Sequence, residues 1–202
     1  IYRIEGTLLI VLDVNLLGTV RLVEALQRHA PKARILFVGS GEEYGRPQNL
    51  PVTEDHPLNP TNPYAISKAA ADHYCAYAAA ATGAPIVRAR PFNHSGPGQA
   101  DVYALPSFAR QIAEIELGKR SPQLKVGNLQ AIRDFTHVAD VVRAYRLLLE
   151  RGRPGEAYNI CSGKGHTIHS VLDELIRLAK AQVEVKVDSE RLRAAEVPEV
   201  RG

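Results

Sequence analysis

The sequence predicts an α/β fold with a mainly parallel sheet. Apolar runs with the length of buried strands alternate with segments whose apolar residues recur at helical spacing. This alternation is typical of sheets whose parallel strands are connected by helices. The 202 residues are enough for one domain, or for one domain and a smaller lobe.

The first predicted elements are a short strand, a helix and a buried strand. The apolar run Leu8–Leu12 predicts a short buried strand. From Asn15 to His29, apolar residues recur every three or four positions, which predicts a helix that Pro31 ends. The continuous apolar run Ile35–Val38 has the pattern of a buried parallel strand.

A long loop, an alanine-rich helix and a second buried strand are expected next. Proline, asparagine and threonine are frequent between Gly45 and Pro63, which indicates a loop. The alanine-rich segment Tyr64–Ala81 precedes Gly83, and glycine commonly ends helices. The run Ile86–Arg90 predicts the following strand.

The C-terminal half continues the alternation of helices and strands. Helical periodicity predicts helices at Leu105–Leu117, Val138–Glu150 and Ile168–Ala179. Short apolar or alternating runs predict strands at Leu124–Val126, Ala157–Cys161 and Val183–Val187. We expect the last of these strands to be exposed.

The strongest chemical signal lies in Tyr64–Lys68 and in Ser40 upstream of it. Tyr64 and Lys68 are four residues apart, so on a helix they share one face. An ammonium near a phenol favours the phenolate, so we expect Lys68 to lower the pKa of Tyr64. Ser40 follows a buried strand, at the edge where open α/β sheets bind ligands. The three residues together suggest carbinol–ketone chemistry on a nicotinamide, whereas Tyr64 and Lys68 alone could be a surface pair.

Composition excludes several classes of function. A net charge of +3 is too small to argue for a nucleic-acid or membrane surface. Cys75 and Cys161 match no metal spacing and lie in apolar stretches, so we expect buried free thiols in a reducing, cytoplasmic compartment. The histidines show no metal-ligand spacing either, and we expect no metal. No apolar run approaches the length of a membrane span.

Features that are missing from the sequence predict a fragment of a longer chain. The first residues lack the basic and apolar regions of a signal peptide, and the sequence contains no Met. It also contains no glycine-rich turn of the kind that follows the first strand of a dinucleotide fold. We therefore expect the second half of such a fold, without most of the first half.

Five segments resemble a known family. They are Ser40–Gly45, Asn62–Lys68, Arg90–Gln99, Val126–Phe135 and Arg191–Pro198. With them, the chain from about Asn15 to Gly202 resembles the extended short-chain dehydrogenases/reductases of the NAD-dependent epimerase/dehydratase family, which modify nucleotide sugars. The last three segments are the more specific ones, and they point to a GDP-hexose.

The resemblance implies a Rossmann-like sheet and a set of catalytic and cofactor-binding residues. Residues 1–98 would be an incomplete dinucleotide-binding part, and residues 99–202 mainly a substrate lobe with some strands returning to the sheet. Ser40 would bind the reacting oxygen at carbon 4 of the sugar, and Tyr64 would transfer its proton. Lys68 would tune Tyr64 and hold the nicotinamide ribose. Asn15 would help to order this site, although it could be a plain helix N-cap.

The resemblance also implies substrate-binding residues. Asn93 would lie near the diphosphate, and the forked donors of Arg133 would pair with it. Arg193 and Glu196 would line the guanosine end, whereas Arg191 is expected to be a surface residue. Turn chemistry alone could explain Asn93, and Arg133 could form a surface ion pair with its neighbour Asp134.

Two activities fit the resemblance, and a third interpretation is non-catalytic. A reductase would use NADPH to convert the carbon-4 ketone of GDP-4-keto-6-deoxy-D-mannose to GDP-D-rhamnose or a stereoisomer. The pattern Ser-x-Glu-Glu-Tyr-Gly at Ser40–Gly45 favours it, although Gly41 replaces a serine that is common in relatives. A GDP-mannose 4,6-dehydratase would instead use Glu42 as the base at carbon 5. A nucleotide-sugar binder or an inactive fragment is the third possibility.

The resemblance leaves the cofactor and the assembly as expectations. We expect NADP, with NAD as the alternative, because the region that distinguishes them is not in the sequence. Relatives often dimerise through a four-helix bundle, here formed by residues 15–29 and 64–81. An alanine-rich helix buried inside one subunit is the alternative.

Overall fold

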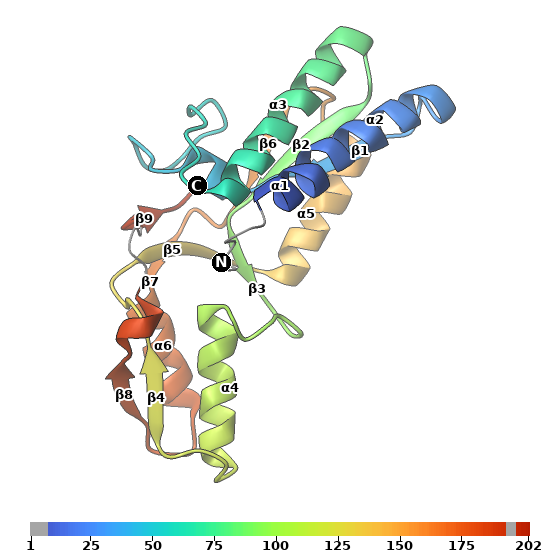
Figure 1. The fold of residues 1–202 in the computed structure, drawn as a ribbon. Helices are drawn as coiled ribbons and strands as arrows, with labels where there is room; N and C mark the ends of the chain where they lie inside the picture. The colour runs from blue at the N-terminus through green and yellow to red at the C-terminus, as the bar shows by residue number, and fades with distance from the viewer. Residues whose placement is uncertain (1–7, 193–196) are drawn as a thin grey trace.

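The computed structural model describes residues 8–192 and 197–202, and its upper part is a three-layer α/β arrangement (Figure 1). The sheet has the parallel order β1–β2–β6, formed by β1 (Ile35–Val38), β2 (Ile86–Pro91) and β6 (Ala157–Ile160). Helix α3 (Pro63–Thr82) packs on one face and α5 (Val138–Arg151) on the other. The predictions for these three strands and two helices are confirmed to within a few residues.

The alanine-rich helix α3 lies close to the sheet because its inward face is small. Ala71 and Ala78 are buried there against Phe37 in one hydrophobic core. The helix begins where the side chain of Asn62 accepts a hydrogen bond from the Ala65 amide at 2.9 Å. These contacts fix the helix that carries Tyr64 and Lys68 against the strand that leads to Ser40.

The chain from residue 8 to residue 29 is helical throughout, so the predicted strand at Leu8–Leu12 is wrong. The segment comprises α1 (Leu8–Leu12), the π-helix η1 (Asp13–Leu17) and α2 (Gly18–His29). A short apolar run does not distinguish a strand from a helix by itself. Here the run leads into the next helical segment without a glycine or proline to separate them.

The lower part is a small lobe with its own core (Figure 1). It contains α4 (Ala104–Glu116), α6 (Ile168–Leu178) and the parallel pair of β4 (Gln123–Val126) and β8 (Glu184–Val187). Its core includes Phe108, Leu124, Val126 and Leu172. All four residues of β8 are exposed, as the alternating sequence predicts.

Strand β5 (Ile132–His137) joins the two parts and was not predicted from the sequence. It pairs in parallel with β3 (Asn93–Ser95) and β9 (Glu199–Val200), and antiparallel with β7 (Gly165–Thr167). These strands are short or rich in polar residues, so they lack the apolar patterns that predict strands. Their pairing brings residues from distant parts of the sequence together beside the sheet.

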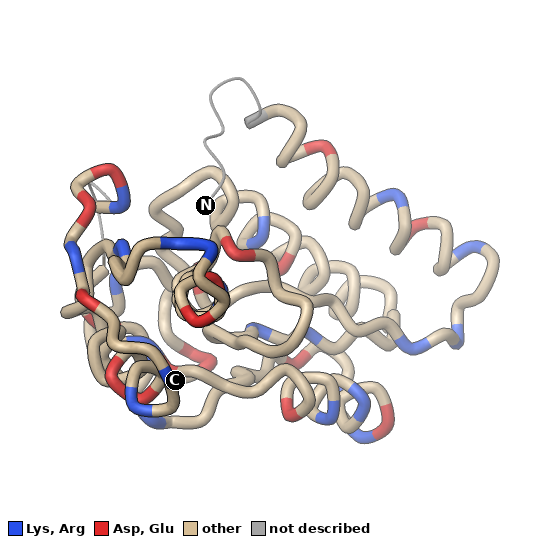
Figure 2. Tube along the Cα trace, turned by 90° about the horizontal axis from the view of Figure 1, so that it is seen from below, with Lys and Arg blue, Asp and Glu red and all other residues tan. Residues whose placement is uncertain are grey.

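Charged residues of both signs are interspersed along the chain (Figure 2). Many form exposed pairs, such as Arg146 and Glu150 on α5. Within the described ranges, no helix is both long and apolar enough to cross a bilayer. Both cysteines are free thiols, but Cys161 is only partly buried, unlike Cys75 and unlike the expectation for both.

Candidate active site

Ser40 lies at a tight turn just beyond the carboxyl end of β1. Its side chain accepts a hydrogen bond from the Glu42 amide at 3.2 Å and caps the 3-10 helix η2 (Gly41–Tyr44). The Ser40 amide donates in return to Glu43 Oε1 at 2.7 Å. This reciprocal arrangement is a capping box, which fixes the backbone of the turn.

Tyr64 and Lys68 on α3 approach the same turn, as the sequence predicts. The Tyr64 phenol is hydrogen-bonded with the Ser40 side chain. Lys68 Nζ donates to the carbonyl of Val38, the last residue of β1, at 2.8 Å. The fold therefore brings Ser40 close to Tyr64 and Lys68, which are distant from it in the sequence.

The pKa of Tyr64 departs from the sequence-based expectation. Burial raises it, and the hydrogen bond with Ser40 opposes that rise only in part. Burial also lowers the pKa of Lys68, which the charge of Glu43 opposes. The expectation of a lowered pKa for Tyr64 is wrong in this structure, because desolvation of the phenolate raises the pKa and the nearby Glu42 and Glu43 raise it further. A raised pKa keeps the phenol protonated, so Tyr64 is suited to donate a proton.

Glu42 and Asn15 each form a hydrogen bond with a residue close in sequence to Tyr64 or Lys68. Asn62 Nδ2 donates to the exposed carboxylate of Glu42 at 3.0 Å. Asn15 Nδ2 donates to Ser67 Oγ at 2.9 Å, next to Lys68. Asn15 lies inside η1 and not before a helix, so the N-cap interpretation is wrong. A π-helix is rare and often lies at a functional site.

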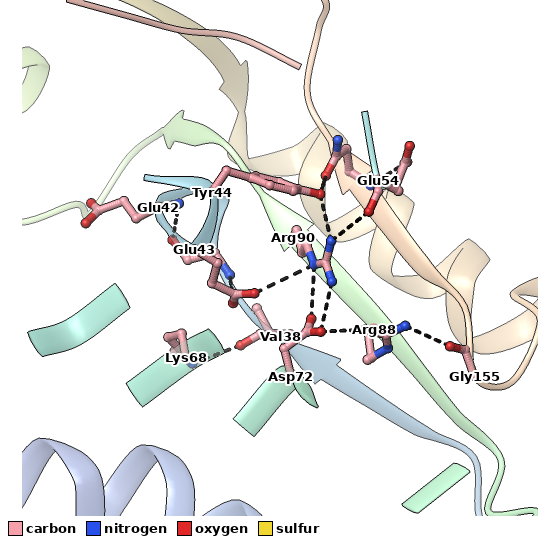
Figure 3. Close-up of polar contacts among 12 residues, drawn as sticks. Val38, Glu42, Glu43, Tyr44, Glu54, Lys68, Asp72, Arg88, Arg90 and Gly155 are labelled. Carbon is pink, nitrogen blue, oxygen red and sulfur yellow. Dashed lines mark hydrogen bonds and ion pairs between the residues drawn. The ribbon is translucent and has the colours of Figure 1, made fainter. Parts of the chain in front are cut away.

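A buried network of charged residues lies behind the turn (Figure 3). Asp72 on α3 accepts hydrogen bonds from Arg88 and from Arg90, the latter at 2.9 and 3.1 Å. Arg90 also donates to the Tyr44 hydroxyl at 2.9 Å, which in turn donates to Asn159 Oδ1 at 2.7 Å. Sequence reasoning missed this network. The available signal was an aspartate in an alanine-rich helix and two arginines within an apolar strand.

A cavity of about 360 Å³ lies between β3, β5, α4 and the segment that follows β8. Its lining includes Asn93 and Arg133, which the resemblance assigns to the substrate diphosphate. Arg133 Nη1 donates to the Ile132 carbonyl at 2.8 Å. Tyr103 also lines the cavity and is near enough to raise the pKa of Tyr64. Tyr103 therefore connects the cavity with the surroundings of Tyr64, whereas Ser40, Tyr64 and Lys68 do not line the cavity themselves.

The environment of Arg133 corrects one further expectation. Asp134 is fully buried and accepts hydrogen bonds from the amides of Ser162 and Gly163, at 2.8 and 2.7 Å, so it is no surface partner for Arg133. Arg191 is exposed, as the sequence suggests, and it also lines the cavity.

Arg191 reaches the cavity wall from the 3-10 helix η3 (Ser189–Arg191), and Arg191 Nη1 donates to Ser107 Oγ at 3.2 Å. The predicted guanosine residues Arg193 and Glu196 lie outside the described residues.

The Tyr64–Lys68 pair fits one part of a nicotinamide cofactor. An ammonium carries three protons, and the bond to the Val38 carbonyl uses one. Lys68 and Tyr64 together could therefore bind ribose hydroxyls at the end of β1. The described cavity residues include no cluster of His, Cys, Asp and Glu that could hold a metal ion.

Comparisons with known proteins show the family to which the chain belongs. Residues 8–202 match the family model described as GDP-mannose 4,6 dehydratase. GDP-6-deoxy-D-mannose reductase of Pseudomonas aeruginosa is 40% identical over 193 residues, which are 95% of this chain and 64% of the relative. GDP-mannose 4,6 dehydratase 2 of Arabidopsis thaliana is 31% identical over 94% of this chain and 52% of the relative.

The chain is also similar in its three-dimensional structure to a solved protein. The structure of RMD from Pseudomonas aeruginosa complexed with NADPH matches with a TM-score of 0.89 and 40% identity. The match covers 95% of this chain and 64% of that one. The chain thus spans less than two thirds of the length of this relative.

Proposed function

Because the chain belongs to the GDP-mannose 4,6-dehydratase family of NAD-dependent nucleotide-sugar enzymes, we propose that it reduces the carbon-4 ketone of GDP-4-keto-6-deoxy-D-mannose with NADPH. The product would be GDP-D-rhamnose or a stereoisomer. One observation carries the proposal: the Tyr64 phenol, whose pKa burial raises, has the Ser40 side chain as a hydrogen-bonding partner, and Arg133 lines a cavity nearby.

In this reaction, the residues of the turn act on the oxygen at carbon 4. Bound NADPH supplies a hydride to carbon 4, so negative charge develops on that oxygen. The Ser40 hydroxyl donates a hydrogen bond to the oxygen, and the Tyr64 phenol transfers a proton to it. The ammonium of Lys68 favours the tyrosinate that remains.

The substrate-binding part of the proposal rests on the cavity. Arg133 would form charge-assisted, forked hydrogen bonds with the diphosphate, and Asn93 would donate its side-chain amide nearby. Both residues line the same cavity. Arg193 and Glu196 would bind the guanosine end, and Asn15 would support Lys68 through its contact with Ser67.

The test uses protein expressed from its complete reading frame. We expect NADPH to be consumed when the 4-keto sugar is present, with a GDP-6-deoxyhexose as product. Absence of turnover by protein that binds NADPH would overturn the reductase proposal. A fluorescence titration with NADPH that shows no binding would favour a non-catalytic nucleotide-sugar binder.

The alternative is a dehydratase in which Glu42 removes the proton at carbon 5. Glu42 is exposed, and its carboxylate contacts Asn62 at the start of α3, close to Tyr64 in the chain. GDP-mannose alone distinguishes the two activities. A dehydratase would convert it to the 4-keto-6-deoxy sugar, whereas the proposed reductase leaves it unchanged. Glu42→Gln should abolish the dehydration if Glu42 is the base.

We also infer a homodimer formed through the helices on one face of the sheet. Helices α2 and α3 lie side by side (Figure 1). They expose the large apolar residues Leu22 and Tyr77, with exposed fractions of 58% and 68%. Light scattering at several concentrations measures the mass, and Leu22→Glu should shift a dimer toward monomer. A monomer at all concentrations would contradict this inference.

A further inference from the structure

Three consecutive residues at the end of β1 are each held by a different partner. The Val38 carbonyl accepts a hydrogen bond from Lys68 Nζ at 2.8 Å. The Gly39 amide donates to the Ala89 carbonyl at 2.8 Å. The Ser40 amide donates to Glu43 Oε1 at 2.7 Å. The peptide group that ends in the Ser40 amide is therefore held by the side-chain carboxyl of Glu43.

The carboxyl of Glu43 lies in an unusual environment for a helix cap (Figure 3). Glu43 is fully buried, and its Oε2 accepts no hydrogen bond. The nearest cationic atom to that oxygen is Arg90 Nε, at 3.6 Å. The pKa of Glu43 is raised to about 8, mainly by burial and in addition by the negative charge of the neighbouring Asp72. A buried carboxyl with one unbonded oxygen costs stability, and an exposed cap would avoid this cost.

The backbone around Glu43 leaves space for its carboxyl and for little else. A Cβ atom on Gly39 would lie 2.3 Å from Glu43 Oε1 and 3.2 Å from the Ala89 carbonyl oxygen. The carboxyl thus occupies the volume that a side chain at position 39 would need.

We propose that Glu43 is a positioning residue, which holds the Ser40 peptide group so that the Ser40 hydroxyl stays in contact with Tyr64. The proposal rests on the proposed reductase function. Glu43 itself contacts the Ser40 amide and Arg90, and it acts on the reaction through Ser40. The acceptor oxygen of Glu43 is the essential feature, because it makes the bond to the Ser40 amide.

The first test compares two substitutions of similar size at Glu43. Glu43→Gln keeps a side-chain oxygen that can accept from the Ser40 amide, and Glu43→Met does not. We expect Glu43→Met to lower kcat roughly 10²-fold, as a displaced reacting group does, with little change in the KM for the keto sugar. Glu43→Gln should restore most of kcat. A Glu43→Met enzyme with wild-type kcat, or a Glu43→Gln enzyme as impaired as Glu43→Met, would overturn the proposal.

Two further variants separate positioning from general stability. Tyr44→Phe removes hydrogen bonds to Arg90 and Asn159 in the same buried network without touching Ser40, so kcat should stay near the wild-type value. Gly39→Ala leaves Glu43 in place but displaces its carboxyl, so kcat should fall even if Glu43→Met does not fold. Loss of kcat in Tyr44→Phe, or none in Gly39→Ala, would contradict a specific role of the Glu43–Ser40 contact.

A measurement that needs no turnover distinguishes failure of this proposal from failure of the proposed function. Hydrogen exchange of the Ser40 amide, read in peptides that cover residues 39–45, should be faster in Glu43→Met than in the wild type and in Glu43→Gln. Equal exchange in all three would overturn the contact itself. An inactive wild-type enzyme with protected Ser40 would instead refute the reductase function.

Discussion

The network behind Ser40 and the cavity around Arg133 hold their charged residues in opposite ways. In the network, the carboxylate of Asp72 is fully buried and binds two arginines. In the cavity, the side chain of Arg191 is 41% exposed and lies 3.8 Å from its acidic partner Asp188. Buried pairs fix geometry but are costly to break, whereas exposed groups stay available to a ligand. Changes in the network should therefore alter mainly stability, and changes in the cavity should alter KM.

The largest effect is expected at Tyr64, which lies between the two regions. Tyr64→Phe removes the proton donor and should lower kcat roughly 10²- to 10⁴-fold. The free energy of unfolding should change little, because the ring is retained. NADPH oxidation with the keto sugar and urea unfolding measure the two quantities. A variant with wild-type kcat would show that another group supplies the proton.

Asp72 tests the claim that the network is costly to break. Asp72→Asn removes the carboxylate that both Arg88 and Arg90 bind and should lower the free energy of unfolding by about 3–5 kcal/mol. Urea unfolding of the variant and the wild type gives the difference. A loss below about 1 kcal/mol, the size expected of an exposed pair, would remove the distinction between the two regions.

Arg133 tests the opposite expectation for the cavity. Arg133→Gln should raise the KM for the nucleotide sugar by about 10- to 100-fold, since a hydrogen bond to a charged group is worth about 1.5–3 kcal/mol. We expect kcat and the unfolding midpoint to stay close to the wild-type values. Steady-state kinetics with varied sugar concentration decide this. A large fall in kcat at unchanged KM would mean that Arg133 acts on the chemistry.

The raised pKa of Glu43 makes the stability of the network depend on pH. In the folded protein the pKa of Glu43 is about 8, against 4.5 when exposed. Between these values the unfolded state has lost the proton and the folded state keeps it. The contribution of Glu43 to stability is therefore complete below the unfolded pKa and is lost as pH rises through the folded pKa, by at most about 1.4 kcal/mol per pH unit.

Glu43→Gln should remove this dependence, because an amide does not titrate. The difference in the free energy of unfolding between wild type and Glu43→Gln should change in favour of the variant from about pH 5 to about pH 8. Urea unfolding at several pH values measures it, and the subtraction cancels the histidines that both proteins share. A difference that is independent of pH would indicate that the folded pKa of Glu43 is not raised.

The smallest effect is expected for an exposed pair on α5. Arg146 and Glu150 interact at 2.7 Å, with side-chain exposed fractions of 80% and 44%. Glu150→Gln should change the free energy of unfolding by no more than about 0.5 kcal/mol. It is the matched comparison for Asp72→Asn, since both replace a carboxylate by its amide. A loss as large as that of Asp72→Asn would show that burial does not explain the difference.

Local pattern predicted most of the regular elements because each pattern reports one physical property of its segment. The strand at the apolar run Ile35–Val38 and the alanine-rich helix after Asn62 form where the sequence indicates. The run Leu8–Leu12 was misassigned because an apolar segment of that length satisfies either structure. Strand β5 was missed because its polar residues gain their partners only from distant strands.

Some features of the candidate site could likewise be predicted from local sequence, and others depend on tertiary packing. Ser40, Tyr64 and Lys68 could be proposed from spacing and position, because helical geometry and the end of a parallel strand are local properties. The direction of the Tyr64 pKa could not, since burial is set by the packing of α3 on the sheet. The exposure of Arg191 was expected, but its place beside the cavity could not be predicted, because it depends on η3 meeting α4.

The sequence by itself determined the α/β class, the order of the main elements and the residue types of the proton-handling site. Those depend on hydrophobic periodicity and on short spacings, which neighbouring residues define. Only the tertiary structure decided that Glu43 supports Ser40, that Asp72 binds two arginines, and that Asn93 and Arg133 share a cavity. These relations depend on burial and on contacts between distant segments, and neither is a property of a local pattern.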